Sequence, residues 1–196
     1  MAIGLIFCLL WYFIYRPVLY RFLGLQDPLR LTQFKTSMGF VIGVVISILV
    51  GVSTHLIWDG LTHVDFRTFA FRDFLSQSIS LFGQRFPVHR VLQIGTSIVA
   101  LPILVWMCIH YFQQFRQPSP VSSKIKRYAW SLLGLTLLSG IYSVWDYARY
   151  FSYDIWVANL YYFTARSINE FSQAALVIFS TGCLIFMFLD QKQYFE

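Results

Sequence analysis

Residues 36–58 read TSMGFVIGVVISILVGVSTHLIW and contain no charged side chain. A helix rises about 1.5 Å per residue, so about 20 such residues can cross the hydrocarbon core of a bilayer. Further uncharged runs occupy residues 2–15, 91–115, 128–145 and 171–189, and only the first is much shorter. This pattern predicts an all-α fold, a polytopic transmembrane helix bundle forming a single domain over residues 1–196. We expect about five spans, at about residues 2–23, 37–58, 92–113, 128–147 and 171–189.

The composition indicates that lipid is the main solvent of the chain. Of the 196 residues, 57% are hydrophobic and 12% are charged, against roughly 25% charged in soluble domains. The net charge of +6 comes from Lys and Arg residues between the apolar runs, where anionic lipid headgroups can bind them. The sequence has no basic stripe or nucleic-acid-binding motif, so we predict membrane lipid as a partner and no nucleic acid.

Two connections between the expected spans are short and basic. They contain Arg16, Arg21, Arg30 and Lys35 before the second span, and Arg116, Lys124, Lys126 and Arg127 before the fourth. The positive-inside rule places such loops in the cytoplasm, so the N-terminus is expected outside and the C-terminus inside. The longer connections, 59–90 and 146–170, are rich in aromatic residues and are predicted to hold interfacial segments on the outer side. Residues 66–90 are too irregular for a crossing, and Pro87 argues against a continuous helix through their end.

The candidate site is the stretch THLIWDGLTH, residues 54–63, at the outer end of the second span. Its spacing stacks His55 and Asp59 on one helical face, where they can bind one divalent ion. In a continuous helix the Cα of His63 would lie about 12 Å along the axis from that of His55. We expect Gly60 to end the helix in a left-handed turn and so fold His63 back.

Two interpretations of this cluster stay open. Asp59 faces the negative end of the helix dipole, which is unfavourable unless a cation or a donor compensates it, and this favours a metal or catalytic site. In the structural alternative, His55 and Asp59 hydrogen-bond neighbouring helices and His63 is a solvated loop residue. Possible accessory residues on the same predicted side are His89, Arg90, Gln93, Asp146 and Glu170.

Other sites and cofactors are not expected. The sequence has no G-x-S-x-G, Walker loop, H-E-x-x-H or dinucleotide fingerprint, so no nucleotide is predicted. The three cysteines stand singly in apolar runs, without metal-ligand spacing. Haem is not expected either, because His55 and His110 lie near opposite membrane faces in the predicted topology. His110 is predicted to be a packing or interface residue.

Residues 51–63, GVSTHLIWDGLTH, and residues 91–97, VLQIGTS, resemble the DUF4184 family of bacterial membrane proteins. That family is related to membrane-bound metal-dependent hydrolases of the YdjM type. The resemblance covers most of the chain and implies a multi-pass protein of the bacterial inner membrane. Family members usually carry an earlier segment with a Ser-His and a Pro-Asp element that resemble further metal ligands. This sequence is expected to begin after that segment.

The leading functional hypothesis is a metal-dependent hydrolase that acts near the outer headgroup layer. A divalent ion, zinc by ligand type, would be held by His55, Asp59 and His63, and would activate water against a lipid or another envelope ester. The alternative is a non-enzymatic membrane scaffold or stress-response protein whose polar cluster only packs helices.

Overall fold

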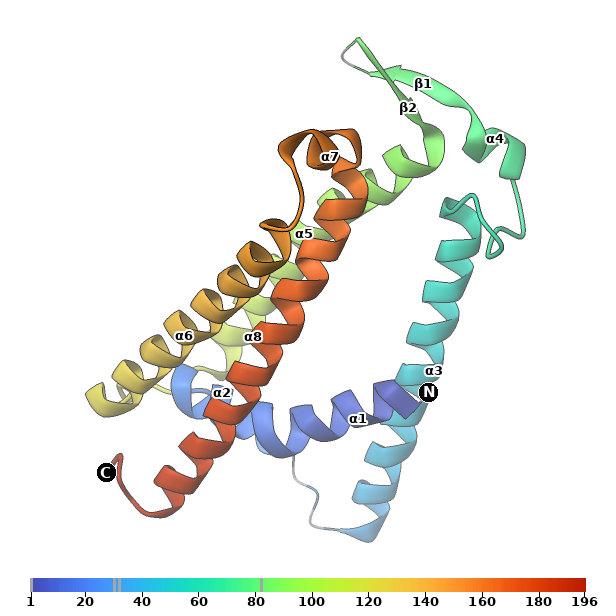
Figure 1. The fold of residues 1–196 in the computed structure, drawn as a ribbon. Helices are drawn as coiled ribbons and strands as arrows, with labels where there is room; N and C mark the ends of the chain where they lie inside the picture. The colour runs from blue at the N-terminus through green and yellow to red at the C-terminus, as the bar shows by residue number, and fades with distance from the viewer. Residues whose placement is uncertain (1, 30, 32, 82) are drawn as a thin grey trace. The chain divides into compact units, whose positions relative to one another are not determined.

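The computed structural model describes residues 2–29, 31, 33–81 and 83–196, and this part of the chain is mostly helical (Figure 1). The helices are α1 (Ala2–Leu10), α2 (Arg16–Leu23), α3 (Phe34–Thr62), α4 (Arg72–Ser76), α5 (Val88–Phe115), α6 (Ser123–Ala148), α7 (Tyr153–Ala158) and α8 (Leu160–Gln191). A π-helical turn, Trp11–Tyr15, joins α1 to α2, and two strands, β1 (Ser78–Leu81) and β2 (Gln84–Pro87), precede α5. Arg30, part of the first predicted basic loop, lies outside the described residues.

Four helical stretches in the described residues are long and apolar enough to cross a membrane. They are Ile3–Leu23, Lys35–Thr62, Val88–Phe115 and Tyr162–Gln191. They contain or overlap four of the expected spans. The prediction of a helical protein with membrane-spanning helices is therefore confirmed. The remaining expected span, 128–147, lies within α6, which is long enough but less apolar because Ser, Thr, Gly and Tyr recur along it. The count of five spans stays a prediction.

The connection predicted as irregular, residues 66–90, contains α4 and a short β-hairpin. β1 and β2 pair antiparallel from Ser78 with Pro87 to Leu81 with Gln84, and Gly83 in the turn has a φ of +79°. This positive φ is characteristic of hairpin turns and favours glycine. The strands were not predicted, because four-residue segments carry too little periodicity to be recognised. Pro87 ends β2 directly before α5, so the expected break in the helix at this point is confirmed.

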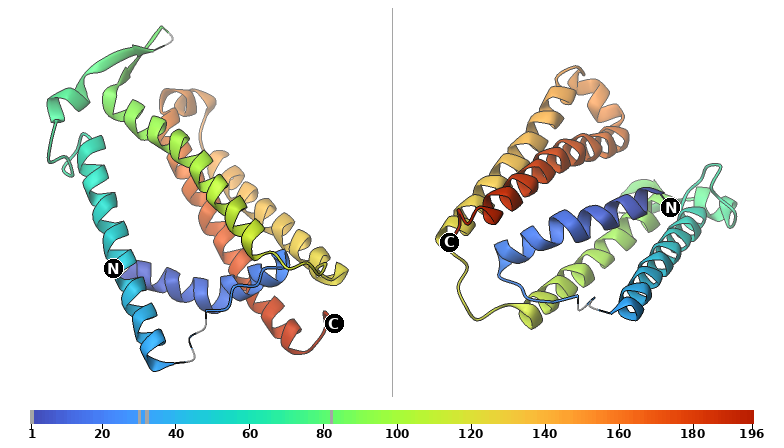
Figure 2. Two further views of the ribbon diagram at one scale, coloured as in Figure 1. Left: turned by 180° about the vertical axis from the view of Figure 1, so that it is seen from behind. Right: turned by 90° about the horizontal axis from the view of Figure 1, so that it is seen from below.

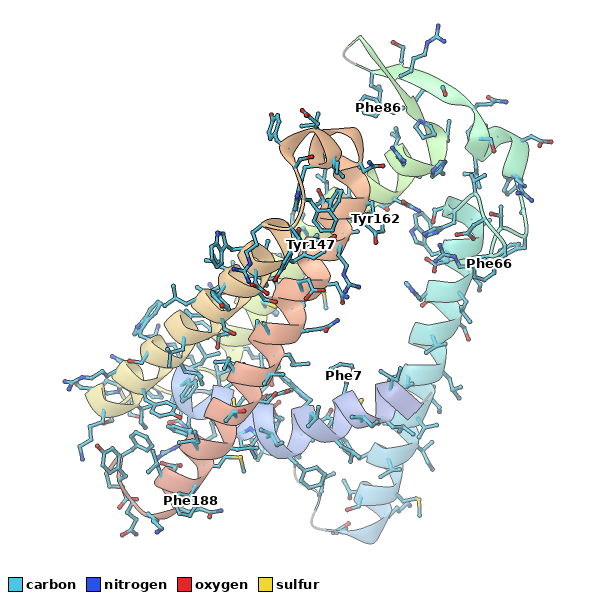
Figure 3. The ribbon with its side chains drawn as sticks, viewed as in Figure 1. Phe7, Phe66, Phe86, Tyr147, Tyr162 and Phe188 are labelled. Atoms are coloured by element: carbon cyan, nitrogen blue, oxygen red, sulfur yellow. The ribbon has the colours of Figure 1, made fainter. Side chains whose placement is uncertain are left out.

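The chain divides into two compact units. Unit 1 comprises Met1–Cys8 and Asp27–Phe115, and unit 2 comprises Leu9–Gln26 and Arg116–Glu196. In unit 1, most apolar side chains of α3 and α5 are exposed, as expected for helices that face lipid. The loop after α3 carries Phe66, whose side chain is 95% exposed and is labelled in Figure 3. An interfacial position for this loop stays a prediction.

In unit 2, α6 and α8 lie side by side along much of their length (Figures 1 and 2). Glycines allow the close approach: a Cβ at Gly140 would overlap the ring of Phe171, and one at Gly182 would overlap Leu132. The buried core of the unit is largely aromatic and aliphatic, and includes Tyr15, Val18, Ile125, Leu132, Cys183, Phe186 and Phe195. Unit 2 therefore contains a packed helical core of its own.

Candidate functional site

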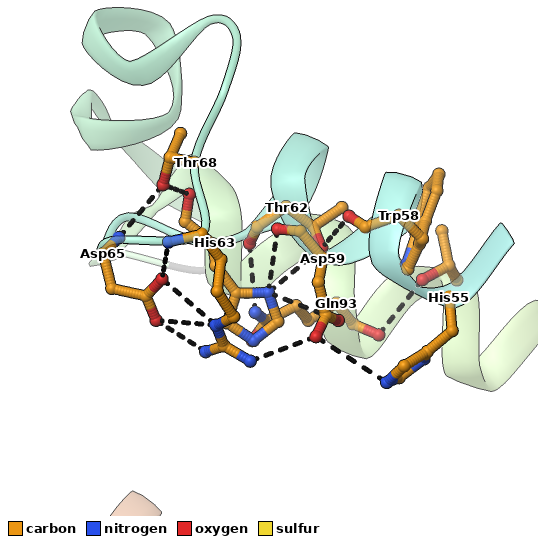
Figure 4. Close-up of polar contacts among 10 residues, drawn as sticks. His55, Trp58, Asp59, Thr62, His63, Asp65, Thr68 and Gln93 are labelled. Atoms are coloured by element: carbon orange, nitrogen blue, oxygen red, sulfur yellow. Dashed lines mark hydrogen bonds and ion pairs between the residues drawn. The ribbon is translucent and has the colours of Figure 1, made fainter. Parts of the chain in front are cut away.

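The predicted cluster lies at the C-terminal end of α3 (Figure 4). The helix continues through Thr62, and His63 is the first residue with an extended conformation, at φ −109° and ψ 159°. The prediction that Gly60 ends the helix is therefore wrong. Gly60 instead lets the following loop pack on the helix backbone: Phe69 N donates to Gly60 O at 3.3 Å, and a Cβ at Gly60 would overlap the Phe69 ring. A residue without a side chain is required for this contact.

Asp59 is at the centre of the cluster, and its side chain is only 13% exposed. Its Oδ2 lies 3.6 Å from Nε2 of His55, one helical turn earlier, and its Oδ1 lies 3.6 Å from Nδ1 of His63. His63 comes this close because its ring turns back over the last helical turn, with Nδ1 3.2 Å from the backbone O of Asp59. The three predicted ligand side chains therefore lie together, with the carboxylate between the two imidazoles.

Two charged residues that were not predicted, Asp65 and Arg67, complete the cluster. Arg67 Nη1 donates to Asp59 Oδ2 at 3.1 Å, while its Nε and Nη2 donate to Asp65, at 2.5 Å for the shortest contact. This guanidinium is the cation that a carboxylate at the negative end of a helix needs. That requirement could have identified it, because Arg67 is the first cation after Asp59 in the sequence.

The contact between Arg67 and Asp65 changes the titration of the carboxyl. Hydrogen bonds from the side chain and backbone of Arg67 lower the pKa of Asp65 from 3.8 to about 2. Thr68 ties the same loop together, since its hydroxyl donates to His63 O at 2.6 Å and accepts from Asp65 N at 3.0 Å. The loop after α3 is therefore held against the helix by ionic and neutral hydrogen bonds.

The predicted accessory residues of unit 1 occupy different positions. Gln93 on α5 donates through Nε2 to the backbone O of Thr62 at 3.0 Å, which joins α5 to the end of α3. His89 directs its Nδ1 to the backbone O of Leu75 on α4, at 3.2 Å. Arg90 follows on α5 with an exposed side chain. Of these contacts, the one from Gln93 reaches the C-terminal end of α3, where the cluster lies.

The other two predicted accessory residues, Asp146 and Glu170, belong to unit 2. Asp146 pairs with Arg149 at 2.6 Å, and Glu170 pairs with Arg166 at 2.8 Å. Both are local pairs, three or four residues apart, of the kind that stabilises a helix end or a helix surface. Their carboxylates thus have partners within their own unit.

The donor atoms of the cluster are spaced for two ligands of one metal ion rather than three. The 3.6 Å between His55 Nε2 and Asp59 Oδ2 is close to the separation of about 3.4 Å between two ligands of a tetrahedral zinc ion. His63 approaches the other carboxylate oxygen, and in the described residues no three His, Cys, Asp or Glu side chains are grouped to hold one ion. His55 and Asp59 therefore fit as a pair of ligands, and Arg67 occupies the same oxygen of Asp59.

An apolar pocket of about 320 Å³ lies beside the cluster. It is lined by Trp58, Leu61, Thr62, Phe71, Phe74, Leu75 and Leu92. Thr62 connects the two features, because it lines the pocket and its backbone O accepts a hydrogen bond from Gln93. The volume is at the lower end of the range for small-molecule pockets, about 300–1,000 Å³. The end of α3 thus combines a polar cluster with an adjoining apolar space.

The sequence model of a domain of unknown function, DUF4184, matches residues 1–190. The chain belongs to the DUF4184 family. The match covers both stretches on which the resemblance rests, residues 51–63 and 91–97, and therefore both α3 and α5. No curated protein and no solved structure matches this DUF4184 chain.

Proposed function

We propose that this chain is a membrane hydrolase, related to metal-dependent hydrolases of the YdjM type, that acts on an ester near the outer headgroup layer. Its site would consist of His55, Asp59 and His63, with a divalent ion, zinc by ligand type, as cofactor. The observation that carries this proposal is the His55–Asp59 pair, whose 3.6 Å separation on one helical face suits two ligands of one ion. The adjoining apolar pocket supports a lipid ester as the substrate class.

The residues of the cluster differ in what they can do. His55, with a side chain 74% exposed, can bind an ion or exchange a proton with a substrate, while the shielded Asp59 orients it. A bound divalent ion would supply Lewis acidity toward an ester oxygen and toward water. Arg67 competes for Asp59 Oδ2, and on release from it the guanidinium can bind an anionic group of a substrate.

The second candidate is a non-enzymatic membrane scaffold, in which the cluster only fixes the end of α3. The specific observation in its favour is the Arg67 guanidinium, which already neutralises Asp59 and ties it to Asp65. An ion pair of this kind satisfies the helix end without a metal. The two candidates therefore differ in what removal of His55 should do, since the Arg67 contact does not involve it.

Elemental analysis of detergent-purified, chelator-washed protein after zinc or manganese reconstitution tests the proposal. We expect near-stoichiometric metal in the parent chain and its loss in the His55→Ala/Asp59→Ala double variant. The matched control is His110→Ala/Asp73→Ala, which removes the same residue types elsewhere in unit 1. Equal metal content in the parent and the His55→Ala/Asp59→Ala variant, or none in either, would contradict the proposal in favour of the scaffold.

The bacterial inner membrane, with the N-terminus outside and the C-terminus in the cytoplasm, is part of the same proposal. It is supported by the basic residues in the first turns of α6, Lys124, Lys126 and Arg127. In intact cells, a Lys124→Cys variant should resist a membrane-impermeant thiol reagent, whereas a Ser80→Cys variant in the hairpin should react. The native cysteines are first replaced by Ala. Reaction of Lys124→Cys alone from outside would reverse the orientation.

A further inference from the structure

A second pocket lies within unit 2, between α2, α6 and α8. It has a volume of about 260 Å³ and is lined by Leu19, Phe22, Leu23, Lys126, Ala129, Trp130, Leu133 and Phe179. We call it the α2–α6 groove. Its four α6 residues have the spacing i, i+3, i+4 and i+7, which places them on one face of the helix. That face begins with a cation and continues with apolar side chains for about 10 Å.

The walls of the groove are ordered by packing on the aromatic core. Phe22 contacts Phe186 edge to face at 4.7 Å between ring centroids, and Tyr128 at 6.1 Å. Trp130, on the open side, is 72% exposed, and Leu133 is 43% exposed. Tryptophan side chains favour the level of the lipid headgroups. The groove therefore has a fixed apolar inner wall and an outer wall that is open to lipid.

The charge of Lys126 at one end of the groove is not balanced by other residues that the structure describes. Arg21 is bound to Asp190 at 2.7 Å, and Lys124 donates to backbone carbonyls that follow α8. Lys126 and Arg127 are exposed, and within the part of the chain that the structure describes their side chains have no hydrogen-bond or ion-pair partner. The first turn of α6 contains no acidic residue. An external anion would complement this end of the groove.

We propose that the α2–α6 groove binds one anionic glycerophospholipid, with an acyl chain along Phe22, Ala129 and Leu133 and the phosphate at Lys126. The apolar part of the groove matches the acyl chain of a lipid, and the unpaired Lys126 ammonium at its end matches the phosphate of the headgroup. A zwitterionic lipid carries its own ammonium group, so Lys126 favours a lipid with net negative charge. This site is independent of the cluster at the end of α3, which belongs to unit 1.

Quenching of Trp130 fluorescence by brominated lipids measures occupancy of the groove. The full chain is reconstituted in phosphatidylcholine vesicles that contain a small, equal fraction of brominated phosphatidylglycerol or brominated phosphatidylcholine. The contribution of Trp130 is the difference between the parent and a Trp130→Phe variant, because the chain contains six tryptophans. We expect stronger quenching of Trp130 by the anionic lipid at low ionic strength, and a smaller difference at high salt.

Variants of the groove are compared with a variant of equal charge change elsewhere in unit 2. Lys126→Gln should reduce the preference for the anionic lipid about fivefold, the effect of one cation near an anionic surface. In the parent chain, the Lys192 ammonium lies 4.5 Å from the centroid of the Phe188 ring. The Lys192→Gln variant should keep most of the preference for the anionic lipid. Ala129→Leu, which fills the groove, should lower quenching while Lys126 is intact. Equal quenching by the two lipids, or an unchanged preference in Lys126→Gln, would overturn the proposal.

Discussion

The two units hold their long helices together in different ways. In unit 2, α6 and α8 pack through glycines and a buried aromatic core. In unit 1, α3 and α5 expose their apolar surfaces and are joined at the end of α3 by polar contacts such as Gln93 to Thr62. Lipid is as apolar as the exposed side chains, so apolar surface gives little force for helix association in a bilayer. Close packing therefore holds the helices of unit 2 together, and a local polar network holds the end of α3 in place.

The largest effect is expected from filling the helix contact in unit 2. Gly140→Ala should lower the free energy of unfolding by about 1–3 kcal/mol, because the new Cβ overlaps the Phe171 ring, which has to move. Gly134→Ala on the same helix is the matched control. Nothing lies within 4 Å of its Cβ position, so it should be neutral or stabilising by up to about 1 kcal/mol. Equal stability of the two variants, measured by unfolding in detergent, would contradict the view that close packing holds α6 and α8 together.

Removal of the Arg67 guanidinium should act on unit 1 locally. Arg67→Gln leaves Asp59 and Asp65 without their shared partner, so the loop of residues 63–69 should exchange its amide hydrogens faster. The packed core of unit 2 should keep its protection, because Arg67 and its carboxylate partners belong to unit 1. Hydrogen exchange read by mass spectrometry measures both regions. Faster exchange along α6 and α8 as well would show that the network is not local.

Acid should release the same loop at a pH set by Asp65. The folded-state pKa of this carboxyl, about 2, is below its ordinary value of 3.8. The stabilisation is therefore complete above about pH 4 and is lost as the pH falls through about 2. The protection factors of residues 63–69, which compare the observed with the intrinsic exchange rate at each pH, should fall between these limits in the parent chain. In Asp65→Asn the exchange should already be fast at neutral pH, and a parent loop that opened near pH 6 would contradict this assignment.

The smallest effect is expected from the exposed ion pair of unit 2. Arg21 binds Asp190 through two hydrogen bonds, at 2.7 and 3.2 Å, but its side chain is 50% exposed. Exposed pairs contribute about 0.2–1 kcal/mol, so Arg21→Gln should change the unfolding free energy by less than Gly140→Ala. A larger loss than in Gly140→Ala would show that ionic contacts, rather than close packing, determine unit 2.

The sequence by itself identified the apolar helices and the spacing of His55 and Asp59. Both are local properties, since hydrophobic length and helical periodicity depend only on neighbouring residues. It also pointed to Asp59 as a carboxylate in need of compensation, without showing which residue provides it. Such patterns detect the weakly apolar α6 and the short strands of the hairpin only poorly.

The tertiary structure alone decided which groups meet at the end of α3. Whether Arg67 reaches Asp59 depends on how the loop closes over Gly60, and whether Gln93 reaches Thr62 depends on how α5 approaches α3. Asp146 and Glu170 differ in this respect, because they pair with arginines three and four residues away, a spacing that the sequence already contains. Contacts across loops and between helices are set by packing of the whole chain, and residue spacing along one helix does not encode them.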